Sequence, residues 1–167
     1  MHLRIMVNEN KRLFLEKQLI PLMRQIDTAA SPRWGKMNAQ QMVEHVSSFF
    51  QISTNQIKFP LATSEELLPK FYAFLMSEKE FRENTKAPIL PEEPLPLQYE
   101  TMDEAVANLE QQVNEFFIYF TDDPEKKTLH PAFGELNFEE WVQLHHKHVK
   151  HHLKQFGINI PELKASV

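Results

Sequence analysis

Five of the eight histidines in this chain stand in one eight-residue stretch, "HHKHVKHH", at residues 145–152. Imidazole nitrogens bind zinc and other first-row metals, and free imidazole also titrates near neutral pH. His148 and His152 are four residues apart, so on a helix both rings would lie on one side and could share an ion. His145 could instead pair with His148 at a spacing of three. Two imidazoles are too few, because catalytic zinc usually takes three protein ligands.

Helical rotation of about 100° per residue separates these histidines. The apolar residues of the segment share one arc, which we expect to face the core: Phe138, Val142, Val149, Leu153 and Phe156. His145 and His152 lie at one edge of that arc, with His148 slightly further out. His146 lies at the opposite edge and His151 points away from the core. We therefore expect His146 and His151 to have hydrogen-bonded structural or surface roles.

A third histidine has a similar position in "NAQQMVEHVSSFF". Met42, Val46 and Phe49 mark the core face of this segment, and His45 lies on its flank. Helix bundles build metal sites from inward side chains on facing helices. Rotation alone does not tell which helices touch, so a metal site and a structural or pH-responsive histidine cluster both remain open.

The elements that must position these residues are predominantly helical. Capping boxes, in which a small polar residue is answered by Glu or Gln three residues later, mark four candidate helix starts: Asn38–Gln41, Thr63–Glu66, Thr101–Glu104 and Asn137–Glu140. Periodicity predicts main helices over residues 9–27, 39–53, 102–120 and 138–156. Pro21 should kink or restart the first, and a shorter helix should begin near Pro69 and run to about Ser77.

The connections complete the predicted fold. Four prolines indicate an extended crossover: Pro88, Pro91, Pro94 and Pro96. Residues 121–137 are expected to form a loop, and Gly157 to end the last helix. The prediction is an all-α four-helix bundle with a long extended crossover and, as an option, a fifth short helix.

Composition limits the other possibilities. The 167 residues suit a single helical-bundle domain spanning residues 1–167. A formal net charge of -5 without a long basic run gives no support for nucleic-acid binding. The absence of cysteine excludes disulfides and thiolate ligands. No signal peptide and no stretch of roughly 20 apolar residues is found, so we expect a cytoplasmic protein outside the membrane.

At its histidines the sequence resembles the DinB/YfiT-like superfamily of metal-dependent four-helix-bundle proteins. The matching segments are "MNAQQMVEHV" and "HVKHHLKQ", with "WGKM" at 34–37 and "HPAFG" at 130–134 pointing to a subfamily of uncharacterised function. About 45 residues in two blocks carry the resemblance. Leu153 and Lys154 stand where Arg-Gly is common in the wider superfamily. The resemblance implies His45, His148 and His152 as metal ligands, with Zn²⁺ or Ni²⁺ as the ion.

The resemblance also implies a function. Relatives include thiol-dependent transferases and hydrolases, so we expect a metal-dependent enzyme of one of these classes. The alternative is a non-enzymatic helical module that binds a metal or a small molecule, and a third is a helical interaction protein. A small-molecule substrate is the expected partner, with a low-molecular-weight thiol as one candidate. A homodimer is a candidate assembly.

The remaining residues near the expected site have several interpretations. The resemblance places His145 close behind the ligands or in the pocket. Trp141 is expected to wall the site or to fill the core, and His130 to reach the pocket rim or to stabilise its loop. No catalytic base can be named, because Glu44 rotates away from His45 and should be solvated. Glu139 and Glu140 are explained by capping and the helix dipole.

Overall fold

The computed structural model describes residues 2–85 and 90–160, with side chains from residue 8 onward. Within these ranges the helices are α1 (His2–Lys17), α2 (Leu19–Arg24), α3 (Ala39–Ser53), α4 (Leu68–Met76), α5 (Met102–Tyr119) and α6 (Phe138–Gln155). Two short strands, β1 (Thr128–His130) and β2 (Gly134–Leu136), pair in antiparallel fashion between α5 and α6.

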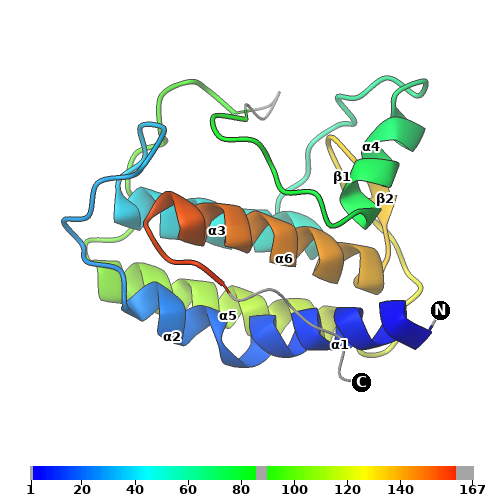
Figure 1. Ribbon diagram of the computed structural model, residues 1–167, viewed down its shortest axis with the longest axis horizontal. Helices are drawn as coiled ribbons and strands as arrows, with labels where there is room; N and C mark the ends of the chain where they lie inside the picture. Colours follow the sequence, from blue (N-terminus) through cyan, green and yellow to red (C-terminus); the bar gives the residue numbers. More distant parts are fainter. Residues whose placement is uncertain (1, 86–89, 161–167) are drawn as a thin grey trace.

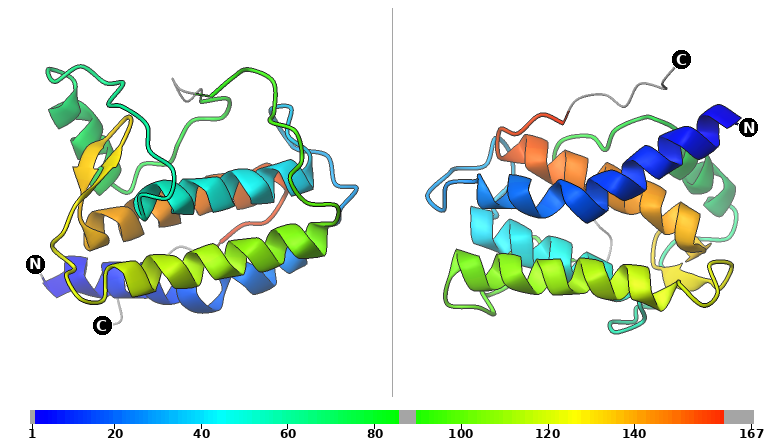
Figure 2. Two further views of the ribbon diagram at one scale, coloured as in Figure 1. Left: turned by 180° about the vertical axis from the view of Figure 1, so that it is seen from behind. Right: turned by 90° about the horizontal axis from the view of Figure 1, so that it is seen from below.

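Four helical rods form the bundle, with α1 and α2 together as the first. Helix α3 packs against α5 and α6, and α1 packs against α6. Figures 1 and 2 show α3 and α6 in one layer, lying on a second layer made of α1, α2 and α5. The expected all-α bundle with a long crossover is therefore confirmed. Helix α4 and the hairpin stand together above one end of the α3–α6 layer.

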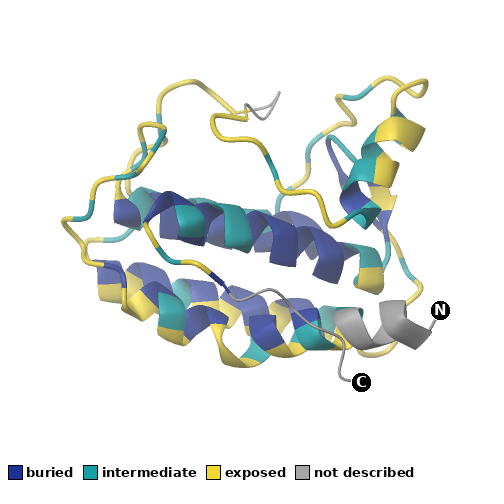
Figure 3. Cartoon of the chain, viewed as in Figure 1, coloured by how far each residue is buried: buried dark blue, intermediate teal, exposed yellow. Residues whose placement is uncertain are grey.

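Apolar side chains from every rod meet in one core. Each rod contributes fully buried residues: Leu15, Leu19 and Met23 from the first; Met42, Val46 and Phe50 from α3; Leu109 and Phe116 from α5; Val142, Val149 and Leu153 from α6. Figure 3 shows the depth of burial along α6, which contrasts with the largely exposed α4. Truncating one of these aromatic residues, such as Phe116, to alanine would cost about 3–5 kcal/mol.

The first rod is broken, as the proline predicts. Helix α1 ends at Lys17 and α2 begins at Leu19, so Pro21 lies in the first turn of the new helix. Proline lacks an N–H group and its ring clashes with the carbonyl four residues earlier, which here belongs to Lys17. The break therefore lies upstream of the proline.

Three of the four capping boxes form. Asn38, Thr101 and Asn137 each accept a hydrogen bond from the third residue of their helix, whose side chain bonds back. The fourth, at Thr63, does not start a helix; α4 begins at Leu68 and holds Pro69 in its first turn. Gly157, with a φ of +87°, follows the end of α6, where a left-handed residue commonly terminates a helix.

The predicted loop over residues 121–137 was wrong in part, because it contains the β1–β2 hairpin. Strands of three residues are too short to show an alternating pattern. The hairpin is tied to the bundle by Thr128, whose Oγ1 accepts from Trp141 Nε1 at 2.7 Å and donates to the Ser53 carbonyl at 2.8 Å. It thereby links the end of α3 to the start of α6.

The crossover to α5 is held against α3 by a buried carboxylate. Glu44, expected to be solvated, is only 9% exposed and accepts from the backbone N–H of Gln98 at 2.5 Å. Gln40 donates to the Tyr99 carbonyl at 2.7 Å and also reaches Glu44. The prediction failed because rotation within α3 does not reveal the chain that returns over it. Of the four crossover prolines, Pro88 lies outside the described residues.

Among the described residues, no helix combines the length and the apolar character that crossing a membrane requires.

Candidate metal centre

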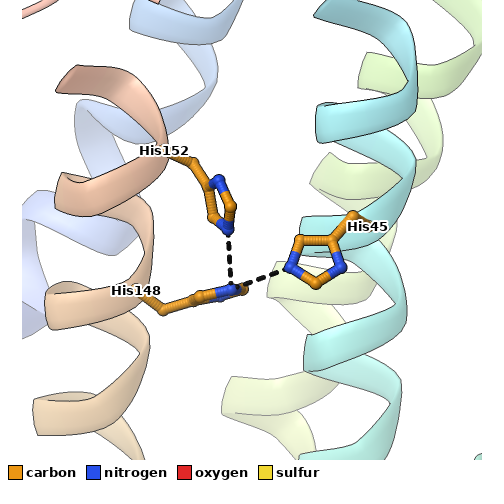
Figure 4. Close-up of side chains that lie close together, drawn as sticks. All are labelled: His45, His148 and His152. Carbon is orange, nitrogen blue, oxygen red and sulfur yellow. Dashed lines mark hydrogen bonds between the residues drawn. The ribbon is translucent and has the colours of Figure 1, made fainter. Parts of the chain in front are cut away.

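Three histidine side chains converge between α3 and α6. His148 and His152 lie one turn apart on α6, and His45 faces them from α3 (Figure 4). His148 Nε2 lies 3.0 Å from His45 Nε2 and 3.0 Å from His152 Nε2. Each residue offers one ring nitrogen, and the three nitrogens lie within 4.8 Å of one another. Residues about 100 positions apart in the chain thus present the same type of donor to one point.

The hydrogen position on His152 follows from its neighbour Gln155. The side-chain amide of Gln155 donates to the Trp34 carbonyl at 2.9 Å, so its oxygen points the other way. That oxygen lies 2.8 Å from His152 Nδ1, which must therefore carry the hydrogen. In the neutral ring the lone pair is then on Nε2, the atom that faces the centre of the triad.

Hydrogen bonding among the three rings cannot satisfy this arrangement. Because His152 Nε2 has only a lone pair, His148 Nε2 could donate its hydrogen there, and would then have nothing to offer His45. If His148 Nε2 instead accepts a hydrogen from His45, it opposes the His152 lone pair at 3.0 Å. In either tautomer at most one of the two short contacts can be a near-linear hydrogen bond. A cation at the point of convergence would satisfy all three lone pairs.

Burial keeps the triad neutral. It lowers the pKa of His45 to about 4, with a smaller contribution from His151. Burial and the neighbouring histidines lower the pKa of His148 well below the ordinary value, and the same holds for His152. His45 is the partly exposed member, whereas His148 and His152 are buried. Neutral imidazole is the form that binds metals, so no proton has to be displaced near pH 7.

The residues present therefore fit a divalent metal ion. Tetrahedral coordination at a Zn–N distance of about 2.0–2.1 Å separates two nitrogens by about 3.3 Å; two of the three separations here are 3.0 Å, and the third is within 4.8 Å. Three imidazoles suit zinc, nickel or copper better than the hard ions that prefer oxygen. A three-histidine set leaves a further coordination position for a substrate atom or water.

His145 does not take part in this convergence. It is completely buried, and neither of its ring nitrogens has a hydrogen-bond partner among the described residues. Its ring stacks on Phe50 at 3.8 Å between ring centroids and lies 5.3 Å from Trp141. Burial lowers the pKa of His145 well below the ordinary value. Its position one turn before His148 therefore places it in the aromatic core and not among the converging nitrogens.

Trp141 and His130 also have definite positions. Trp141 is fully buried, and its ring contacts lie with His145, His130 and Phe49. His130 is the last residue of β1, and its Nδ1 accepts from the backbone N–H groups of Ala132 and Phe133 at 2.9 and 3.2 Å. The hydrogen of the neutral His130 ring is therefore on Nε2. Burial lowers the pKa of His130 to about 3.

The two histidines assigned to structural or surface roles are less exposed than a surface role implies. His146 is 7% exposed and contacts Phe14 edge-on at 5.4 Å, and no described residue bonds to its Nε2. His151, expected to point away from the core, is only partly exposed and lies between Trp34 and Phe81. Helix α1 covers the flank at His146, and segments outside the helices cover the flank at His151, which helical rotation could not reveal.

Two residues support the triad, although the sequence did not predict that role for either. Gln155 sets the orientation of His152, as described above, and Phe49 stacks on His148 at 3.9 Å between centroids. Within the part of the chain that the structure describes, His148 Nδ1 has no hydrogen-bond partner, so stacking takes the place of the usual outer hydrogen bond. Spacing could have suggested both: Gln155 follows His152 by three residues and Phe49 follows His45 by four.

Comparison with known proteins gives one match. The family model described as the DinB superfamily matches residues 23–156, which include all three converging histidines. No match was found among curated proteins or among solved structures.

Proposed function

This chain belongs to the DinB superfamily, and we propose that it binds a divalent metal ion, Zn²⁺ or Ni²⁺, through His45, His148 and His152. The observation that carries the proposal is the convergence of three Nε2 atoms whose contacts no tautomer can satisfy. Gln155 holds His152 with its lone pair inward, and burial keeps the rings unprotonated. A bound ion would lower the pKa of a thiol or water at its open position.

A thiol is the better substrate for this site. The groups that shift the pKa values of the triad are other histidines and Gln155, and no carboxylate is among them. The adjacent Glu44 is bound to Gln98. A thiol, with an ordinary pKa of about 8.5, needs far less assistance to ionise than water at about 15.7. The proposed reaction is therefore transfer of a low-molecular-weight thiol to an electrophilic carbon, and hydrolysis is second.

Binding without turnover is the alternative function, and the lack of a carboxylate among the described groups acting on the triad favours it. A module of this kind would hold the ion, or a small molecule on the ion, and release it unchanged.

Metal content tests the site. Untagged protein, loaded with Zn²⁺ or Ni²⁺ and dialysed, should retain about one ion per chain by elemental analysis, since catalytic zinc is usually held by three protein ligands. His45→Ala should retain none. The matched control is His151→Gln, which alters a neighbouring histidine outside the triad and should retain the ion. A wild-type protein that holds no ion would end the proposal.

Turnover separates the enzyme from the binding module. Metal-loaded protein would be mixed with N-acetylcysteine and 1-chloro-2,4-dinitrobenzene, where sulfur replaces chlorine and releases chloride and a proton. The proposal expects a rate above that of metal-free protein and of His45→Ala. Hydrolysis of 4-nitrophenyl acetate in a parallel assay would favour the hydrolase. A loaded protein inactive in both assays would favour binding alone.

A further inference from the structure

An unbroken chain of aromatic contacts leads from one histidine of the triad to another. It runs from His148 through five residues to His152, and we call these five the aromatic rim: Phe49, His130, Phe133, Phe81 and His151. Successive centroid distances along the path are 3.9, 5.1, 5.0, 6.5, 5.8 and 5.0 Å. The circuit closes at the triad, where His148 and His152 lie 4.5 Å apart.

The rim is assembled from segments far apart in the chain. Phe49 belongs to α3, His130 to β1, Phe133 to the hairpin turn, and His151 to α6, while Phe81 follows α4. Helix α4 adds Phe71 beside Phe133 and Phe74 beside Phe81, at 6.2 and 5.3 Å. Figure 1 shows α4 and the hairpin above the layer formed by α3 and α6. Elements outside the bundle thus carry aromatic rings toward the triad.

Hydrogen bonds hold these outer segments in place. Gln143 donates to the carbonyls of Leu75 and Ser77 at 3.0 Å each, and Lys147 donates to the Ser77 carbonyl at 2.9 Å. The segment leading to Phe81 is therefore fastened to α6. At the other side, His130 Nδ1 receives the N–H of Phe133 and fixes the hairpin turn. The rim is preorganised, which lowers the entropic cost of binding a ligand.

The rim differs from the aromatic core in exposure. The core rings Phe50, Phe116 and Phe120 are at most 2% exposed. In the rim, Phe49, Phe133, Phe81 and His151 are all partly exposed, and only His130 is buried. Aromatic faces that are fixed in position and left partly in water gain free energy when another apolar ring covers them.

Resting on the proposed metal site, we propose that the substrate bound at the triad carries an aromatic ring, which lies against Phe81 and Phe133. A substrate bound to the ion would have rim rings as neighbours of two of the ligands, because Phe49 stacks on His148 and His151 contacts His152. Lys147, which precedes His148 in the chain, is engaged with the backbone carbonyls of Ser77 and Lys79. Aromatic stacking is the recognition that the rim offers.

Three hydroxamic acids test this preference for an aromatic ring, because each binds the ion through the same hydroxamate group. Zinc-loaded protein would be titrated calorimetrically with acetohydroxamic, hexanohydroxamic and benzohydroxamic acid. Benzohydroxamic acid should bind at least about tenfold more tightly than acetohydroxamic acid, since burying and stacking a ring contributes that much. Benzohydroxamic acid should also bind more tightly than hexanohydroxamic acid, whose chain is apolar but not planar.

Variants locate the preference in the rim. Phe81→Leu and Phe133→Leu should each lose most of the advantage of the benzo compound, while zinc content and acetohydroxamate affinity stay unchanged. The control is Phe117→Leu, a partly buried aromatic residue of α5 that lies outside the rim and should alter nothing. Equal affinities for all three hydroxamates on zinc-loaded protein would overturn the inference. So would a hexano compound that binds most tightly. Wild-type protein that does not retain zinc would instead refute the metal site.

Discussion

His145 and His148 lie one turn apart on α6, and each stacks on a phenylalanine of α3. The rings of Phe50, Phe116 and Trp141 pack around His145, which is completely buried. Neither of its imidazole nitrogens has a hydrogen-bond partner among the described residues. Around His148 two further imidazoles approach through their nitrogens. Burial and aromatic neighbours are thus common to both residues. What separates a candidate ligand from a packing residue is the convergence of lone pairs, supplied here by His45.

The largest expected difference between these two histidines is in metal binding. His148→Ala removes the nitrogen that contacts both other ligands, so affinity should fall at least about 100-fold, more than loss of an outer partner usually costs. At a metal concentration of 100 Kd the wild type should gain about 2.7 kcal/mol of stability, and this gain should vanish in the variant. Calorimetry and thermal melts with and without a chelator measure both. If His145→Phe lost the metal to the same extent, the distinction would be refuted.

The outer support of the triad gives the next effect. Gln155→Met keeps the volume but removes the oxygen that faces His152 Nδ1, so metal affinity should fall about 10- to 100-fold. Gln155→Glu still accepts from Nδ1 and should recover most of that affinity, although it no longer donates to the Trp34 carbonyl. Competition with a chromogenic chelator would measure the metal dissociation constants of the wild type and of the two variants. Equal losses in the two variants would indicate that only packing matters.

A pH titration extends the comparison to His130, a buried histidine outside the triad. Its pKa is lowered to about 3 from an ordinary 6.5. Between these values His130 takes up a proton in the unfolded chain but not in the folded chain. His130 therefore does not lower the free energy of unfolding above pH 6.5, and lowers it progressively as the pH falls below that value. The slope from this one residue is about 1.4 kcal/mol per pH unit.

His130→Asn isolates that contribution, because an amide oxygen can still accept from Ala132 and Phe133. Denaturant unfolding of metal-free protein would be measured between pH 7.5 and 5. The free energy of unfolding should fall less steeply with pH in the variant, by the slope of about 1.4 kcal/mol per pH unit that one proton contributes. Parallel curves for the two proteins would mean that His130 is protonated in the fold.

The smallest effect is expected at His145 itself. His145→Phe replaces two buried, unpartnered nitrogens with a ring of similar shape, which should raise the free energy of unfolding by about 1 kcal/mol. Metal affinity should stay within about twofold of wild type, because the residue makes no bond to the triad. Urea unfolding of the metal-free protein measures the change. A destabilised variant would show that the nitrogens of His145 are bonded to ordered water.

Local signals in the sequence predicted the helices well. The boxes at Asn38, Thr101 and Asn137 mark helix starts, because a capping box is made by residues three apart. Pro21 and Gly157 likewise act through their own backbone. The box at Thr63 does not start a helix, because Pro69 fits only the first turn of a helix. Helix α4 therefore begins at Leu68, close to the predicted start near Pro69. The hairpin was missed because its three-residue strands are too short to show a pattern, and because it is held by contacts of Thr128 with Ser53 and Trp141, which are far from one another in the sequence.

For the candidate site, the sequence by itself determined the pair His148 and His152, since their spacing on a helix places them together whatever the surroundings. It also determined a core face for each helix. Only the tertiary structure decided that His45 meets that pair, that His145 turns into the aromatic core, and that Glu44 binds the crossover. The physical reason is that each of these depends on which surfaces pack together, and packing joins residues that no local periodicity connects.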